Sequence, residues 1–168
     1  FVQKQMPVAY LKYPEDFVCV AANYTLTSAT TISVYNYDYY QKVDGDGGCI
    51  CAYIPDTSVP AKIQVGPCFL PKFAYGPYWV IAAGPSPDNY QWACISGGQP
   101  TINTGNGCKT GDGTNGSGLW IFNRKQVAPE SDIQMCEEIF QQQGFDTTVM
   151  KDVKQQGCNY PDGRYCTN

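Results

Sequence analysis

Nine cysteines and no histidine are the residues of this chain that point most directly to a chemistry. Zinc sites built from cysteine normally use close Cys-x-x-Cys pairs, whereas the tightest pair here, Cys49 and Cys51, encloses a single residue. We therefore interpret the cysteines as disulfide partners, which indicates an oxidising compartment. Because the count is odd, one cysteine stays free, pairs with another chain, or pairs with a residue upstream of Phe1.

Catalytic motifs are missing from the sequence. Without histidine there is no Ser-His or Cys-His pair, and no serine lies in a Gly-x-Ser-x-Gly turn. Asp44, Asp46 and Asp112 lie in glycine-rich turns, but they lack the spacing and the terminal glutamate of a calcium-binding loop. We expect no metal, no cofactor and no enzymatic activity.

Charge and length further limit the classes of protein to which the chain can belong. The chain has 15 acidic and 11 basic residues and a formal charge of −4, which offers no electrostatic footprint for nucleic acid. No apolar run approaches the ~20 residues that a membrane-spanning helix needs. A length of 168 residues fits a single domain over 1–168.

Short segments rich in β-branched and aromatic residues, bounded by Gly, Pro, Asn or Asp, predict antiparallel strands joined by turns. We expect strands at residues 1–6, 17–26, 31–40, 49–54, 61–66, 75–83, 90–95 and 119–124, with a further strand within 147–153. Eight strands in succession predict an all-β fold, an eight-stranded antiparallel up-and-down β-barrel whose interior can hold one small ligand.

One helix is expected after the barrel, over about 130–143. Pro129 and the acidic residues Glu130 and Asp132 suit a helix start, apolar residues then recur at helical spacing, and Gly144 is placed to end the helix. We expect this helix to pack outside the barrel.

Five motifs follow one another along these segments: Phe17-Val-Cys-Val-Ala-Ala-Asn-Tyr-Thr-Leu26, Ser33-Val-Tyr-Asn36, Gly76-Pro-Tyr-Trp-Val-Ile-Ala82 with Tyr90-Gln-Trp-Ala93, Leu119-Trp-Ile-Phe-Asn-Arg124, and the helix with Phe145-Asp-Thr-Thr148. In this order they resemble the lipocalins, particularly the group of apolipoprotein D, bacterial lipocalin, insect bilin-binding proteins and the carotenoid-binding crustacyanins of crustaceans. The family's Gly-x-Trp signature of the first strand is missing. We expect it to precede Phe1, and we expect Arg124, which matches the family's arginine, to cover the closed end of the barrel.

Alternation along the strands assigns the inner face. If Cys19 and Asn23 point outward, as a disulfide and a glycan require, then Val20, Ala22 and Tyr24 point inward. The same alternation on the next strand directs Ile32, Val34 and Asn36 inward. The resemblance implies that Tyr78, Val80, Ala82, Ala93, Ile95, Trp120 and Phe122 complete the lining. From this set we predict as ligand-binding residues Tyr24, Val34, Asn36, Tyr78, Val80, Ala93, Trp120 and Phe122.

The resemblance also implies the disulfides Cys19–Cys158 and Cys94–Cys136. A hairpin that turns at residues 56–60 would set Cys49 opposite Cys68, within the reach of a disulfide. Among the remaining three cysteines, we pair Cys108 with Cys166 and expect Cys51 to be the odd thiol. Asn23 and Asn115 lie in Asn-x-Ser/Thr triplets, and their glycosylation would agree with secretion.

The expected function is non-covalent binding and transport or storage of a small hydrophobic ligand: a carotenoid, tetrapyrrole, retinoid, sterol or fatty acid. An alternative is a structural subunit that docks on a larger complex or forms a homo-oligomer, with the tyrosines at 35, 37, 39 and 40 as a candidate partner surface. An isomerase or de-epoxidase of lipocalin fold would need a reactive cysteine or paired acids that point into the cavity, and Asp38 is the only inward acidic candidate. Secretion is expected, with an organelle lumen as the alternative.

Overall fold

The computed structural model describes residues 1–37, 46–160 and 166. Its strands are β1 Val2–Gln5, β2 Ala21–Leu26, β3 Thr31–Tyr37, β4 Asp46–Tyr53, β5 Lys62–Gly66, β6 Gly76–Ser86, β7 Asn89–Ser96, β8 Ile102–Asn103, β9 Cys108–Lys109, β10 Leu119–Asn123 and β11 Lys151–Asp152. The helix α1 spans Glu130–Gln142, and short 3-10 helices span η1 Pro14–Phe17, η2 Lys72–Ala74 and η3 Thr147–Val149.

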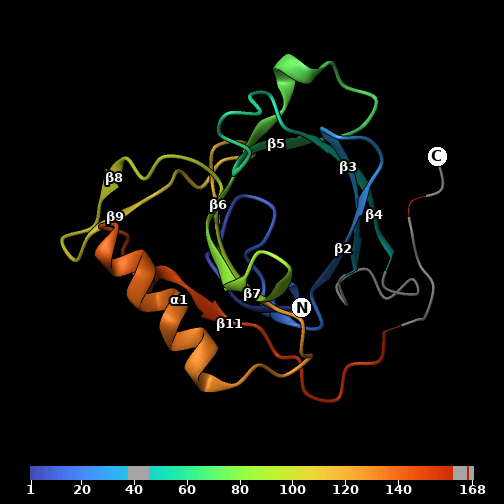
Figure 1. Cartoon of the computed structure of the whole chain (residues 1–168). Coiled ribbons are helices and arrows are strands. Elements are labelled where there is room, and N and C mark those ends of the chain that lie inside the picture. The colour runs from blue at the N-terminus through green and yellow to red at the C-terminus, as the bar shows by residue number, and fades with distance from the viewer. Residues whose placement is uncertain (38–45, 161–165, 167–168) are drawn as a thin grey trace.

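A single antiparallel sheet forms the body of the molecule. Its strands are bonded in the order β11-β1-β10-β7-β6-β5-β4-β3-β2, and the sheet curls into the ring that Figure 1 shows nearly end-on. The all-β class, the meander and the single outer helix are therefore confirmed. The strand β11, which pairs with β1, lies within the further strand predicted over 147–153, whereas the separate β8–β9 hairpin in the glycine-rich loop was not predicted.

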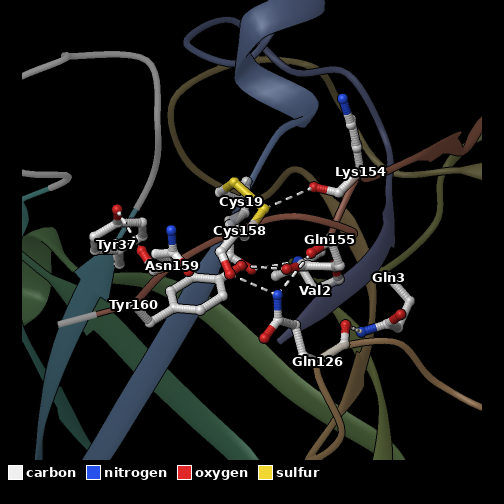
Figure 2. Close-up of a disulfide and its surroundings, with 11 residues drawn as sticks. Val2, Gln3, Cys19, Tyr37, Gln126, Lys154, Gln155, Cys158, Asn159 and Tyr160 are labelled. Carbon is white, nitrogen blue, oxygen red and sulfur yellow. Dashed lines mark hydrogen bonds between the residues drawn. A yellow bond between two sulfur atoms is a disulfide. The ribbon is translucent and has the colours of Figure 1, made fainter. Parts of the chain in front are cut away.

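The seam of the ring lies between β1 and the start of β2. Val2 N donates to Val20 O (3.0 Å), and Gln155 Nε2 donates to both Val2 O (2.6 Å) and Val20 O (2.8 Å), so one side chain ties the two edges together. Beside it, Cys19 is bonded to Cys158 (Figure 2). The segment after β11 thus closes the sheet, a role that is not visible in its sequence.

The helix packs against the outer face of β6, β7 and β10. Cys136 and Phe140 of α1 are completely buried against Cys94, Leu119 and Ile121 of the sheet. Two polar contacts fix the helix in register, because Asn123 Nδ2 donates to Asp132 Oδ2 (2.7 Å) and Lys4 Nζ lies 2.6 Å from Glu137 Oε1. Since Cys94, Leu119 and Ile121 face the helix, their strand neighbours face the interior.

Two predicted boundaries are corrected. The second strand begins at Ala21 rather than at residue 17, because residues 14–17 form η1, whose Asp16 carboxylate accepts Lys12 N and Tyr13 N. Residues 147–149 form η3, since the Asp146 carboxylate caps Thr148 N (2.9 Å), and only 151–152 are strand. The third strand is described to Tyr37; residues 38–40 lie outside the described part of the chain.

The described helices include none that is both long and apolar enough to cross a membrane.

Candidate functional site inside the barrel

Two tyrosine hydroxyls meet inside the barrel. Tyr24 comes from β2 and Tyr78 from β6, strands that the sheet separates by β3, β4 and β5, and their oxygens are 2.7 Å apart. Because β2 and β6 lie on opposite sides of the ring, this hydrogen bond crosses the interior.

A third strand supplies aromatic rings to the same cluster. The Trp120 ring of β10 stacks on Tyr78 with centroids 6.2 Å apart, and Phe122 meets Tyr24 edge-on at 6.3 Å. Gly118 permits the position of Trp120, since a Cβ at that glycine would lie 2.0 Å from the indole and its φ of +114° disfavours other residues. We call Tyr24, Tyr78, Trp120 and Phe122 the aromatic cluster.

The environment of Tyr24 combines burial with open surface. Burial raises the pKa of Tyr24 to about 12, and burial together with the neighbouring Tyr24 raises the pKa of Tyr78 well above 10. Tyr24 nevertheless keeps 45% of its surface exposed. The hydroxyl is therefore surrounded by protein, while part of the ring remains accessible.

The strand register places the remaining predicted residues on the inner face. Val34 lies opposite Tyr24, Asn36 lies opposite Ala22, and Val80 lies opposite Ile95. Ala93 pairs with Phe122. Val34 is buried, whereas Asn36, Val80, Ala93, Trp120 and Phe122 keep part of their surface accessible. The eight predicted ligand residues therefore share one face of the sheet.

The inward position predicted for Ala82 is wrong. A bulge between Val80 and Ala82 adds one residue to β6, so that Ala82 lies opposite the outward Cys94 and Ala83 lies opposite the inward Ala93. One extra residue moves every later side chain of a strand to the other face. Ala82 consequently packs against the helix cluster.

Sequence analysis missed several inner residues. Ile63 and Val65 of β5 lie opposite Tyr78 and Gly76. Gln5 pairs with Trp120, is completely buried, and donates from Nε2 to Asp16 O (2.9 Å), while its Oε1 has no partner among the described residues. Simple alternation from the inward Val2 would direct Gln5 outward. Its inward position results from the irregular register between Val2 and Lys4, which the sequence does not reveal.

Four disulfides and one free thiol account for the nine cysteines, all of which are described. Cys19 is bonded to Cys158 and Cys94 to Cys136, the two pairs that the resemblance implied. The other pairs are Cys51–Cys68 and Cys49–Cys166, and Cys108 is free.

The predictions for Cys49–Cys68, Cys108–Cys166 and a free Cys51 are therefore wrong. The chain leaves the ladder at Pro67, where a turn forms with Leu70 N donating to Pro67 O (2.9 Å), and this brings Cys68 over Cys51. Cys49 is then available to the C-terminal segment. Cys108 lies in the β8–β9 hairpin, where its backbone pairs with Gly144 and Asp146.

The remaining predicted residues are exposed on the surface or lie outside the described part of the chain. Arg124 is exposed at the end of β10, with its backbone N donating to Gln91 O (2.8 Å) and its Nε to Tyr90 O. Asn23 and Asn115 are exposed, and their glycosylation stays a prediction. Asp38, the candidate acid, lies outside the described residues, as do Tyr39 and Tyr40.

The tyrosine-rich outer face predicted as a partner surface is partly covered by this chain itself. Tyr35 is only 8% exposed, and the Tyr37 hydroxyl donates to Asn159 O (3.2 Å) while its ring contacts Tyr160 at 5.0 Å (Figure 2). Tyr35 is therefore not available for docking.

A groove elsewhere on the molecule contains none of the predicted ligand residues. It lies between the 6–20 connection and β11, and its lining consists of Pro7, Lys12, Pro14, Phe17, Lys151 and Asp152. No group of three or more His, Cys, Asp or Glu side chains that could hold a metal is found among the described residues.

Comparison with known proteins gives matches at the level of structure alone. No family model and no curated protein sequence matches the chain. Among solved structures, lobster apocrustacyanin A1 matches with a TM-score of 0.57 and 16% identity over 93% of this chain and 76% of that one. H1 crustacyanin from the lobster Homarus americanus matches with a TM-score of 0.59 and 16% identity, over 93% and 75%.

Apocrustacyanin C1 gives a similar result, with a TM-score of 0.57 and 15% identity over 94% of this chain and 76% of that one. Identities this low establish the arrangement of the strands and not the ligand. The order of the strands, the outer helix and these structural matches together show that the chain has the lipocalin fold.

Proposed function

We propose that the protein binds and carries a small hydrophobic molecule, without covalent chemistry, inside its barrel. The observation that carries the proposal is Tyr24, whose hydroxyl is desolvated by surrounding protein while 45% of the side chain remains exposed. A side chain that merely filled the core of a small barrel would have little exposed surface. The open face of this ring is a surface that an apolar ligand can cover.

The inner face suits an apolar ligand. Its described residues are mainly aliphatic and aromatic, and the aromatic cluster lies among them. Apolar contact contributes ~25 cal/mol per Å² of buried surface, so the lining can provide most of the affinity.

The hydroxyl pair favours an uncharged ligand with an acceptor oxygen. In a pair of neutral phenols one O–H bonds to the other oxygen, and the second O–H remains available for an external acceptor. The raised pKa values keep both phenols neutral at physiological pH. No lysine or arginine occurs among the described residues of the inner face, so a carboxylate would be buried without a countercharge.

These features favour a carotenoid, a neutral retinoid or a sterol over a fatty acid. The cysteine pattern, which resembles that of the crustacyanins, also favours a pigment, of which a carotenoid and a tetrapyrrole are the candidates. Four disulfides agree with the proposed secretion into an oxidising compartment.

Retinol and retinoic acid provide a matched pair of probes, since they share a polyene and differ in the charge of one end. Binding should be followed by quenching of tryptophan fluorescence in protein freed of endogenous ligand by organic extraction. We expect retinol to bind more tightly than retinoic acid at neutral pH. Equal affinity, or a preference for the acid, would contradict the proposed role of the hydroxyl pair.

Neighbouring residues on opposite faces of β6 supply the control for the cavity itself. We expect Trp120→Ala and Tyr78→Ala to weaken retinol binding roughly 10-fold or more, because each removes a buried aromatic surface. Trp79→Ala, which removes an outward ring beside Lys62, should leave the affinity unchanged. Unchanged affinity in both inner variants would overturn the cavity assignment and favour the alternative, a structural subunit with a filled barrel.

A further inference from the structure

The connection between β5 and β6, residues 67–75, exposes more aromatic surface than any other connection in the described part of the chain. Phe69 is 86% exposed and Phe73 is 89% exposed, with Leu70 between them at 36%. Figure 1 shows η2, which contains Phe73, standing outside the ring beyond β5. We call residues 67–75 the phenylalanine loop.

The phenylalanine loop is fixed in place rather than free to fold back. Cys68 is bonded to Cys51 of β4, and the Tyr75 ring packs on Gly66, where a Cβ would lie 2.7 Å from the ring. Lys72 Nζ lies 4.7 Å from the centroid of the Tyr53 ring. Because both ends and the middle are anchored, the two phenylalanine rings cannot reach the core without breaking these contacts.

The segment 57–87, which contains the loop, carries only positive charge in an otherwise acidic chain. Between Asp56 and Asp88 there is no acidic residue, whereas Lys62 and Lys72 lie on the outer surface of this region. Lys62 Nζ lies 4.6 Å from the Trp79 ring, on the strands β5 and β6 that the loop connects, so each ammonium is held above an aromatic ring. The whole chain has a formal charge of −4.

Exposed phenylalanines next to lysines match the interface of an anionic lipid bilayer, where aromatic rings enter the headgroup region and cations meet lipid phosphates and carboxylates. A second copy of this acidic chain could also cover the Phe rings. Self-association would not explain, however, why acidic residues are absent between Asp56 and Asp88. We propose that the phenylalanine loop docks the protein reversibly on an anionic membrane surface. This docking site is separate from the barrel interior and does not depend on the proposed ligand.

Antiparallel connectivity places the loop at the end of the barrel that carries the long connections 6–20 and 97–118, because successive connections alternate between the two ends. Docking there would bring that end of the barrel to the bilayer. An apolar molecule could then pass between the bilayer and the barrel interior.

The test is sedimentation of the protein with vesicles of phosphatidylcholine alone and of phosphatidylcholine mixed with phosphatidylserine. We expect stronger binding to the mixed vesicles, decreasing with added salt. Phe69→Ser/Phe73→Ser should lower the partition coefficient roughly 10-fold or more, and Lys72→Gln should lower it about five-fold on mixed vesicles only.

Leu26→Ser/Val127→Ser is the matched control, because it removes two apolar side chains that are 67% and 60% exposed at the opposite end of the barrel. This variant should bind vesicles as the original protein does. Sedimentation velocity on each protein without lipid monitors self-association, and far-ultraviolet circular dichroism verifies folding.

The proposal is overturned if the original protein binds neither vesicle, or if the Phe69→Ser/Phe73→Ser variant binds as well as the control. It is also overturned if that variant instead dissociates a dimer formed by the original protein, since the loop would then serve a second copy. Retinol binding by the same variants is measured in parallel, so that failure of docking and failure of the barrel site are distinguished.

Discussion

The hydrogen bond between Tyr24 and Tyr78 should make their removal non-additive. The two oxygens are 2.7 Å apart, and surrounding protein desolvates both hydroxyls. Tyr24→Phe or Tyr78→Phe alone leaves one hydroxyl without its partner, which costs about 1–3 kcal/mol in a buried site. Removing both hydroxyls restores an apolar contact, so the double variant should cost no more than either single variant.

The expected coupling energy is therefore about 1 kcal/mol or more, measured as the difference between the double variant and the sum of the singles. Thermal unfolding of the ligand-free protein with intact disulfides provides the assay, in which 1 kcal/mol corresponds to about 2–4 °C for a domain of this size. Tyr90→Phe is a matched control, since Tyr90 is 44% exposed, almost the same as the 45% of Tyr24.

Tyr90→Phe should change the free energy of unfolding by no more than about 0.5 kcal/mol, as is usual for surface positions. Two results would refute the reasoning: single variants whose effects add without coupling, or an effect of Tyr24→Phe no larger than that of Tyr90→Phe. Either would mean that the two phenols do not meet within the barrel in solution.

Two further predictions concern pH and the disulfides. The pKa of Tyr24, about 12, and that of Tyr78 are raised by burial, so the folded protein keeps protons that the unfolded chain loses near pH 10. The free energy of unfolding should therefore be unaffected by these groups below about pH 10 and should fall as the pH rises through about 12. The fall should be less steep in Tyr24→Phe/Tyr78→Phe. Phenolate absorbance and unfolding curves are measured together, and an equally steep fall in the double variant would contradict this assignment. Cys94→Ala/Cys136→Ala removes a bond between fully buried cysteines separated by 42 residues. Loss of this cross-link should lower the free energy of unfolding by ~4 kcal/mol, with strand content kept in the folded state, and a loss below ~1 kcal/mol would contradict its expected contribution.

Local sequence patterns were sufficient to predict the strands and the helix, because these elements depend on the preferences of neighbouring residues. Alternation of side chains along β3 predicts that Val34 and Asn36 share a face, because the pleat repeats every two residues. The start of α1 at Glu130 follows from Pro129 and the acidic first turn, and Gly144 has the positive φ of +83° that ends a helix. Strand order follows from short connections, since neighbours in sequence pair in space.

The candidate site needed more than alternation. The aromatic cluster could be anticipated as a set of inward rings on separate strands, but the 2.7 Å contact between Tyr24 and Tyr78 depends on the curvature of the whole sheet. The bulge in β6, which turns Ala82 outward, is likewise absent from the pattern, because apolar residues occupy both faces of that strand.

The sequence by itself determined the antiparallel strands, the outer helix, the inner positions of the regular strands and the presence of disulfides, since these depend on composition and on periods of two or 3.6 residues. Tertiary structure decided which cysteines pair, because Cys49 and Cys51 share one face of β4 and only the departure of the chain at Pro67 selects Cys51 for Cys68. It also decided how the barrel closes, through Gln155 at the seam, and where Phe69 and Phe73 stand exposed. These features depend on where distant segments meet, which is fixed by packing of the complete chain.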